Sequence, residues 1–155
     1  MFYRTTITIL LLCCALHAIT QNELNPKFGS ITSFDGLSHN SVNDIVIDDY
    51  GFLWIGTMDG LNRYDGSRFE LFKHIPGDST SLLNNTVWSL AEGCDNDILI
   101  GTATGLCRFS YASNSFEHIP LSEDKTTIRG ITMDDKDQLW AGSEVDGLFL
   151  SLIHI

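Results

Sequence analysis

The chain has 155 residues, the length of one ordinary domain, and its 20 acidic against 9 basic residues give a formal net charge of −11. It contains no basic stripe and no alternation of basic with aromatic residues. Because an acidic surface repels phosphate backbones, these features exclude nucleic acid as an expected partner.

Residues 1–20 are predicted to be a secretory signal peptide. Arg4 supplies a positive charge ahead of a largely apolar stretch of 13 residues, 7–19. This stretch suits a signal sequence but is short for a membrane span, which needs about 20 residues. The mature chain is expected to begin near Gln21, after cleavage behind Ala18 or Thr20, and to be periplasmic.

A nine-residue block occurs three times in the rest of the chain, at residues 49–57, 94–102 and 135–143. Each copy ends in glycine followed by a hydroxyl residue, at Gly56, Gly101 and Gly142, so the spacings are 45 and 41 residues. A period of this length built from short apolar runs is typical of one supersecondary unit repeated, and for strands it indicates propeller blades.

Each unit contains short apolar runs separated by clusters of Gly, Asp, Asn and Ser, which are turn residues. The expected strands lie near 43–47, 52–57, 61–64 and 69–75, then 87–92, 97–102, 105–109 and 115–119, and finally 129–133, 138–142 and 147–150. No unit shows helical periodicity over a useful length. The predicted fold is therefore all-β, an incomplete β-propeller of about three four-stranded antiparallel blades.

The predicted domain is residues 21–150, the N-terminal part of a propeller. It begins with an outer strand at 28–34, which in a closed ring would join the last blade and clasp it. The blades then follow at 37–81, 82–126 and, incompletely, 127–150. Residues 151–155 match no part of the repeat and are expected to be foreign to the fold.

Acidic turns recur between the first and second strand of every unit, at residues 48–51, 95–97 and 134–137. Oxygen ligands also suit calcium, but a tight turn needs Asx side chains and residues that tolerate positive φ, and we favour this structural interpretation. Trp54, Leu99 and Trp140 are equivalent positions, or one column, when the three units are aligned. Since leucine can replace the tryptophan, the column is expected to fill the space between blades rather than to bind sugar.

The innermost strands supply the candidate ligand site. Asn43, Trp88 and Arg129 share one column, differ between units and can all form hydrogen bonds. They are expected to face the central channel, on the side where the loops 58–59, 103–104 and 144–146 open. An oligosaccharide would suit this column, with Trp88 for stacking and Arg129 for charge-assisted hydrogen bonds.

No cofactor, metal site or catalytic set is predicted. The histidines do not cluster at a zinc spacing, and no nucleophile, base and orienting group occur together. Cys94 and Cys107 are expected to remain an unpaired turn residue and a buried small hydrophobe, although a disulfide between them is the alternative.

The first unit closely resembles the two-component regulator propeller repeat. That repeat reads D-x-x-G-x-[LI]-W-[IV]-G-T, then Gly-Leu, then Arg-Tyr-Asp, and residues 49–65 follow it throughout. The second unit departs at Leu99 and Ser110, and the third matches as far as Phe149. The resemblance covers about residues 28–149.

The resemblance implies the extracytoplasmic sensor of a Bacteroidetes-type hybrid two-component histidine kinase that responds to glycan breakdown products. Its partners would be further blades and downstream signalling domains, and the propeller segment itself would not be an enzyme. Two alternatives stay open: an extracellular propeller enzyme similar to a sialidase or lyase, and a secreted scaffold that binds no ligand.

Overall fold

The computed structural model describes residues 27–121 and 125–151, in which eleven strands form three antiparallel sheets. Two units divide the chain, residues 1–30 and 31–155, and every strand belongs to the second. The predicted signal peptide, residues 1–20, and most of the predicted tail, 152–155, lie outside the described residues. No helix long and apolar enough to span a membrane occurs in the described ranges.

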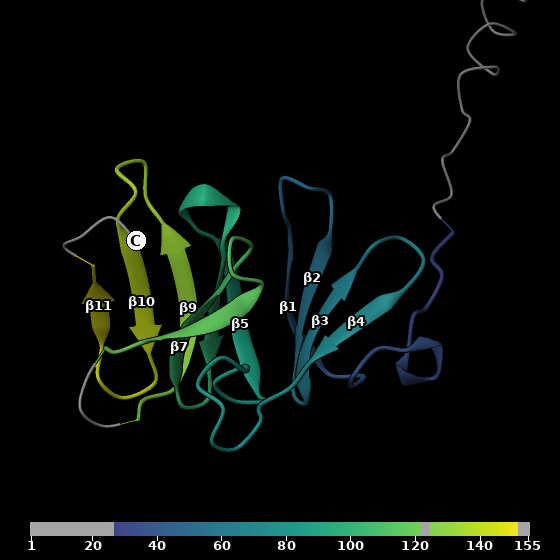
Figure 1. The fold of residues 1–155 in the computed structure, drawn as a ribbon, viewed down its shortest axis with the longest axis horizontal. Helices are drawn as coiled ribbons and strands as arrows, with labels where there is room; N and C mark the ends of the chain where they lie inside the picture. The colour runs from purple at the N-terminus through teal and green to yellow at the C-terminus, as the bar shows by residue number, and fades with distance from the viewer. Residues whose placement is uncertain (1–26, 122–124, 152–155) are drawn as a thin grey trace, which may run out of the picture. The chain divides into compact units, whose positions relative to one another are not determined.

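Each sheet follows the order of the chain, as Figure 1 shows from purple to yellow. The first sheet contains β1 (Val42–Ile47), β2 (Leu53–Thr57), β3 (Gly60–Tyr64) and β4 (Phe69–Phe72). The second contains β5 (Val87–Glu92), β6 (Ile98–Thr102), β7 (Gly105–Ser110) and β8 (Ser115–Ile119). The third contains β9 (Ile128–Met133), β10 (Leu139–Ser143) and β11 (Leu148–Leu150).

The all-β prediction is confirmed, and each strand expected within the three blades is present. The largest difference is at β4, which ends at Phe72 where the prediction extended to 75. The reason is side-chain bonding beyond the strand: the backbone N–H of His74 donates to Asn85 Oδ1 at 2.7 Å, and that of Ile75 donates to Ser81 Oγ at 2.9 Å. These bonds draw the chain into the connection to the next blade.

The predicted outer strand at 28–34 is wrong at its end. Ser33–Asp35 form a 3-10 turn, η1, closed by a capping box. In it the backbone N–H of Thr32 donates to Asp35 Oδ2, and Thr32 Oγ1 accepts the backbone N–H of Phe34. Such local bonds compete with strand pairing. Residues 28–32 lie in no strand of the described part, and their pairing with a last blade stays a prediction.

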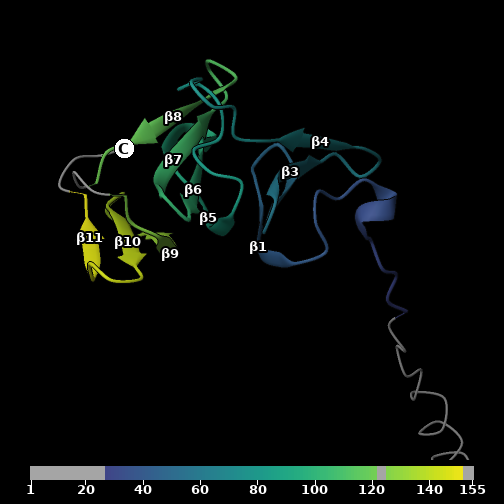
Figure 2. The ribbon, with the colours of Figure 1, turned by 90° about the horizontal axis from the view of Figure 1, so that it is seen from below.

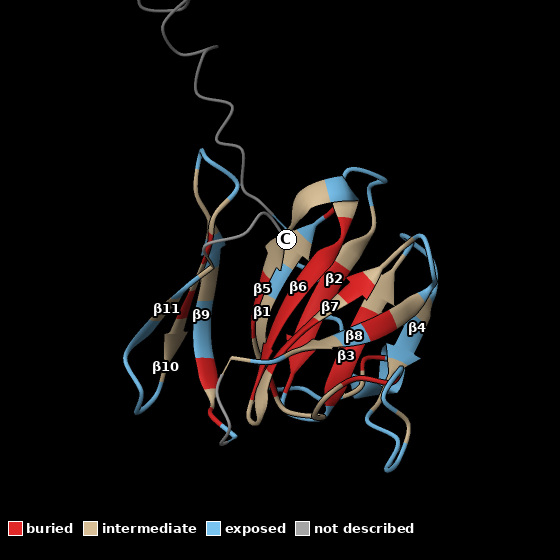
Figure 3. Ribbon diagram, turned by 60° about the vertical axis from the view of Figure 1, so that its left-hand side comes forward, coloured by how far each residue is buried: buried red, intermediate tan, exposed pale blue. Residues whose placement is uncertain are grey.

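The sheets pack face to face as successive blades. In each sheet the first strand lies innermost, and β1, β5 and β9 are neighbours, whereas β4 and β8 lie on the opposite side in Figure 2. We call the face that meets the following blade the leading face, and the opposite one the rear face. Trp54 and Leu61 on the leading face of the first blade share one core with Val87, Phe109 and other residues of the second blade. Figure 3 shows buried residues concentrated along the middle strands β2, β6 and β7.

Glycine permits the closest approach between blades. A Cβ added at Gly56 would lie 2.6 Å from Cγ1 of Val87, and one at Gly101 would lie 2.9 Å from Cγ2 of Ile128. Gly56 and Gly101 therefore each form a hollow on the leading face of their blade, into which a branched side chain of the next blade fits. The packing explains why this position must lack a side chain.

The acidic turns are structural, as expected. Asp48 Oδ1 accepts the backbone N–H of Phe52 at 2.9 Å, and Oδ2 accepts the indole N–H of Trp54 at 2.7 Å. Asp134 repeats both bonds, to Gln138 at 2.9 Å and to Trp140 at 3.0 Å. The hydrogen bond from the Trp140 indole contributes most to lowering the pKa of Asp134 below its usual value.

The second blade replaces both members of this pair. Gly93 stands where the other blades have aspartate, and Leu99 stands where they have tryptophan. A Cβ on Gly93 would lie 3.2 Å from Cγ of Leu99, so the leucine occupies the space that the carboxylate would need. Because Trp54 and Leu99 are both buried between blades, the prediction that their column fills the interface is confirmed. Trp140 is half-buried.

Both described cysteines, Cys94 and Cys107, are free, as expected, and the alternative of a disulfide between them is wrong. Cys107 is buried within the core between the first and second blades, and burial raises the pKa of its thiol to about 12. Cys94 lies half-buried in the one-turn 3-10 helix η2 (Cys94–Asn96). A neutral buried thiol acts here as a small apolar side chain.

Candidate ligand site

The three candidate residues lie at one irregularity of the fold, repeated in each blade. The pairing register shifts between Val42 and Asp44 in β1, between Val87 and Ser89 in β5, and around residue 129 in β9. Asn43, Trp88 and Arg129 are therefore the extra residues of three β-bulges. A bulge turns one side chain away from the alternation of its strand, and bulges are common beside functional sites.

The bulges bring Trp88 and Arg129 into contact. The Arg129 guanidinium carbon lies 3.8 Å from the centre of the Trp88 ring, close enough for a strong cation–π interaction. Arg129 also forms an ion pair with Glu144, with 2.8 Å between Nη2 and Oε1. Its side chain nevertheless remains 42% exposed. The guanidinium is thus held in position by two neighbours while part of it faces solvent.

Asn43 differs from Trp88 and Arg129 because its side chain bonds to the neighbouring blade. Its Nδ2 donates to the backbone oxygen of Val87 at 2.6 Å and contacts the sulfur of Met58 at 3.5 Å. These contacts join β1 to β5, so the amide is part of the contact between blades. Asn43 therefore contacts Val87, the residue before Trp88. Of the three candidates, only Trp88 and Arg129 are in direct contact with each other.

The Trp88 indole nitrogen is buried and has no hydrogen-bond partner within the part of the chain that the structure describes. A buried N–H without an acceptor costs free energy, about 1–3 kcal/mol for a neutral group. The ring as a whole is only half-buried. Trp88 therefore combines an accessible ring with an unsatisfied donor.

Two features of the site were not foreseen from the sequence. The first is Glu144, which lies in an expected loop but was not paired with Arg129; the loop of this blade has one residue more than its equivalents. The second is the role of the hydroxyl residue after each glycine. Thr57 Oγ1 donates to the backbone oxygen of Gly60, and Thr102 Oγ1 to that of Gly105, each at 2.9 Å. These bonds close the loops that flank the site, and the repeated Gly-Thr pair was their signal.

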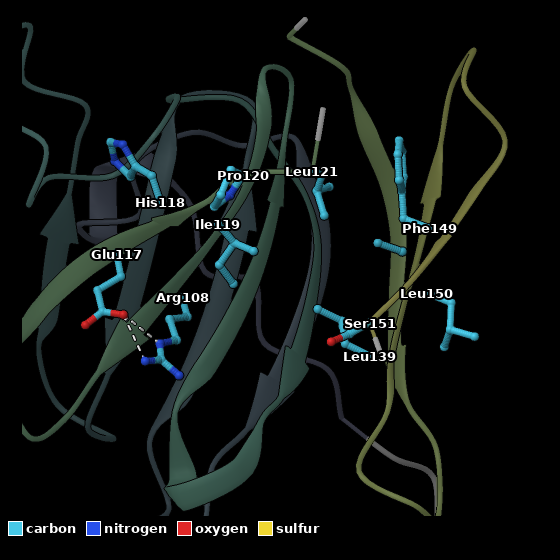
Figure 4. A pocket seen from close by; sticks show the side chains of 11 residues that line it. Arg108, Glu117, His118, Ile119, Pro120, Leu121, Leu139, Phe149, Leu150 and Ser151 are labelled. Atoms are coloured by element: carbon cyan, nitrogen blue, oxygen red, sulfur yellow. Dashed lines mark hydrogen bonds and ion pairs between the residues drawn. The ribbon is translucent and has the colours of Figure 1, made fainter. Parts of the chain in front are cut away.

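A separate groove of about 540 Å³ lies between the second and third blades, away from the bulges. Figure 4 shows it bordered by Arg108 and Glu117, which form an ion pair at 2.8 Å, and by apolar side chains that include Ile119, Leu139 and Phe149. Between the first and second blades the equivalent space is filled by the aromatic rings of Phe109 and Phe116. The groove therefore reflects incomplete filling of a blade interface.

Metal binding receives no support from the geometry. Within residues 27–121 and 125–151, no group of three or more His, Cys, Asp or Glu side chains is placed to hold an ion. The carboxylates of the acidic turns bond to backbone and indole N–H groups instead.

Comparison with known proteins gives a family match and relatives from two-component systems. Residues 36–59 match the family model for the two component regulator propeller. Histidine kinase P4 of Formosa agariphila is 48% identical over 68 residues, which are 44% of this chain and 5% of that protein. The chain therefore spans only a small part of this curated relative.

Two solved structures from B. thetaiotaomicron share the fold. The extracellular domain of the hybrid two component system BT4673 matches with 29% identity and a TM-score of 0.62, over 72% of this chain and 15% of that one. The extracellular domain of the hybrid two component system BT3049 matches with 24% identity and a TM-score of 0.67, over 81% of this chain and 20% of that one. The repeated block, the stacked antiparallel sheets and these relatives agree with the match of residues 36–59 to the two component regulator propeller, and the chain is similar to the extracellular domains of hybrid two component systems.

Proposed function

We propose that this chain is part of the extracytoplasmic sensor propeller of a hybrid two-component regulator, and that it contributes to binding an oligosaccharide released by glycan breakdown. The predicted signal peptide, the family match and the extracellular domains among the structural relatives support the location. Phosphotransfer would belong to other domains of the complete protein, as the curated relative is a histidine kinase.

The observation that carries the ligand site is the contact between Trp88 and Arg129 on adjacent bulges. Oligosaccharides present flat C–H faces and many hydroxyl groups. The indole ring of Trp88 can pack against a C–H face of the sugar. The guanidinium of Arg129, which is held by Glu144, can donate hydrogen bonds to the sugar hydroxyl groups. Because Arg129 is positioned before any ligand arrives, little ordering entropy would be lost on binding.

The ligand class is tested on the complete extracytoplasmic domain of the protein. Isothermal titration calorimetry with purified oligosaccharides, neutral and uronic-acid-containing, is expected to show saturable binding of at least one class. Binding by none of these sugars, from a domain that unfolds cooperatively, would contradict an oligosaccharide sensor.

Replacing Trp88 or Arg129 with alanine is expected to weaken binding of that sugar about tenfold, equivalent to about 1.4 kcal/mol. Each change removes one half of the contact pair, while the midpoint of thermal unfolding stays within a few degrees of the wild type because both side chains are partly exposed. Isothermal titration calorimetry measures the affinity for the sugar, and circular dichroism measures the midpoint of thermal unfolding.

Arg108→Ala is the matched control, since this arginine also pairs with a glutamate but lies away from the bulges. Its affinity for the sugar should equal that of the wild type. If Trp88→Ala and Arg129→Ala bind as tightly as Arg108→Ala, the ligand site lies in another part of the complete protein.

A further inference from the structure

The repeat itself places one loop side chain near the bulge residue of each blade. This side chain belongs to the first residue of the loop between the second and third strands of the blade. The backbone N–H of that residue donates to the backbone oxygen two positions before the bulge residue, in the same way in each blade. The three bonds run from Met58 to Ser41 at 3.2 Å, from Ala103 to Thr86 at 3.0 Å, and from Glu144 to Thr127 at 3.0 Å. The residue type at this loop position therefore decides which group lies near Asn43, Trp88 and Arg129.

The three loop side chains differ in chemistry, and each suits its own blade. The sulfur of Met58 lies 3.5 Å from Nδ2 of Asn43, and Ala103 offers only a methyl group. Glu144 forms an ion pair with Arg129, with 2.8 Å between Oε1 and Nη2. A charged bulge residue occurs only in the third blade, and the loop of that blade supplies the opposite charge. Each pair of bulge and loop residues therefore carries no net charge.

The ion pair changes what Arg129 can bind. A guanidinium binds a carboxylate best through two parallel N–H bonds, which requires a free fork of donors. On Arg129, Nη2 is already paired with Glu144, and the guanidinium carbon lies 3.8 Å from the centre of the Trp88 ring. The side chains of Arg129 and Glu144 are 42% and 49% exposed, so the negative charge faces solvent beside the positive one. An anionic group that approached Arg129 would therefore meet the carboxylate of Glu144.

A neutral hydroxyl group fits the same ion pair without this repulsion. It is both a donor and an acceptor, so it can accept from another N–H of Arg129 and donate to the carboxylate of Glu144. The equivalent loops add no positive charge, because residues 58–59, 103–104 and 144–146 include three acidic residues and no basic one. The arrangement therefore favours uncharged sugars over anionic ones.

We propose that Glu144 restricts the site of Trp88 and Arg129 to uncharged oligosaccharides and excludes sugars that carry a carboxylate at this position. A binding site discriminates by repelling the wrong ligand as well as by attracting the right one. Glu144 is the repelling group, since its backbone bond to Thr127 and its ion pair with Arg129 hold it beside the guanidinium. This selectivity rests on the proposed function, in which Trp88 and Arg129 contact the sugar.

Isothermal titration calorimetry on the complete extracytoplasmic domain tests the selectivity with pairs of oligosaccharides that differ only at C6. The pairs are the β-1,4-linked tetramers of mannose, glucose and galactose, each with its C6-oxidised uronic acid form. The neutral member of a pair is expected to bind at least about tenfold more tightly than the acidic member, because like charges in contact are strongly unfavourable. An acidic member that binds as tightly as its neutral counterpart, or more tightly, would overturn the selectivity and leave the oligosaccharide sensor standing. Binding of no member, by a domain that unfolds cooperatively, would contradict the sensor and the selectivity together.

Glu144→Gln separates the effect of the charge from that of side-chain shape. Glutamine keeps an oxygen that accepts from Arg129, and an exposed ion pair contributes little, so affinity for the neutral sugar should stay within about threefold of the wild type. Affinity for the acidic sugar should rise at least about tenfold, since the repelling charge is gone. Glu117→Gln is the matched control, because Glu117 also pairs with an arginine at 2.8 Å and is 55% exposed; it should change neither affinity. If Glu144→Gln binds the acidic sugar no more tightly than Glu117→Gln does, Glu144 does not select the ligand.

Discussion

Trp54→Ala is expected to lower the free energy of unfolding by about 3–5 kcal/mol, the usual cost of removing a large buried aromatic side chain. Trp54 is fully buried between the first and second blades. Its ring lies 5.6 Å from that of Phe72 and 5.0 Å from that of Phe109, centre to centre. Since natural domains are stable by only about 5–15 kcal/mol, this single change would remove a large share of the total.

The loss has a polar part besides the cavity. Asp48 accepts both the indole N–H of Trp54 and the hydroxyl of Tyr111, which comes from the second blade. Burial, and then the bond to Asp48, raises the pKa of Tyr111 to about 12. Alanine at position 54 would leave the buried carboxylate of Asp48 with one donor fewer. It would also remove the ring over which the guanidinium of Arg63 lies, at 5.5 Å from the ring centre.

Urea denaturation monitored by circular dichroism measures the effect. Trp88→Ala is the matched control, because it removes the same side chain from a half-buried position. It is expected to cost about 1 kcal/mol or less, as is usual away from a packed core. If Trp54→Ala were as stable as Trp88→Ala, the aromatic cluster would not hold the first two blades together.

Gly101→Ala is expected to have the second largest effect, about 2–3 kcal/mol. The added Cβ would lie 2.4 Å from Ser89 Oγ, 2.9 Å from Ile128 Cγ2 and 3.0 Å from the backbone oxygen of Ile128. Backbone cannot rotate away as a side chain can, so the third blade would have to shift. The expected fall in the thermal midpoint is roughly 5–10 °C for a chain of this size.

Differential scanning calorimetry on Gly101→Ala and Gly130→Ala separates crowding from the loss of glycine itself. Gly130 also lies in a strand, but an added Cβ there meets nothing within 4 Å. Gly130→Ala should leave the midpoint unchanged or raise it slightly, because alanine reduces the entropy of the unfolded chain. Equal losses in both variants would show that the hollow at Gly101 is not crowded.

The sequence predicted the strands well because the fold repeats a short local pattern. Three copies of one block allow turns and strands to be aligned against each other, so an ambiguous run such as residues 128–133 is interpreted from its counterparts. The predicted strand ends were less accurate where a segment forms hydrogen bonds that the other units do not repeat. Thr32 and Asp35 close a local turn in place of a strand end, and Asn85 and Ser81 end β4 early.

The candidate site was found only in part for a similar reason. The column of Asn43, Trp88 and Arg129 follows from alignment of the repeats. The bulges that turn these side chains out of the strand alternation depend on pairing with the neighbouring strand, and no residue type signals them. The ion pair of Arg129 with Glu144 depends on how a longer loop folds back.

A double-mutant cycle between Gly56 and Val87 tests most directly that successive repeats are blades stacked face to face. These residues are 31 positions apart in the chain, and only blade docking brings them together. Gly56→Ala forces a Cβ to within 2.6 Å of Val87 Cγ1, and Val87→Ala removes that atom but leaves a cavity beside Gly56. Each single change is expected to cost about 1–3 kcal/mol.

In the double variant the methyl group introduced at position 56 occupies space that the Val87 side chain has vacated. The free energy of unfolding, measured in urea, is therefore expected to fall by at least about 1 kcal/mol less than the sum of the two single changes. Independent sites add to within about 0.3–0.5 kcal/mol. Additivity within that margin would contradict the stacked-blade structure at its closest contact.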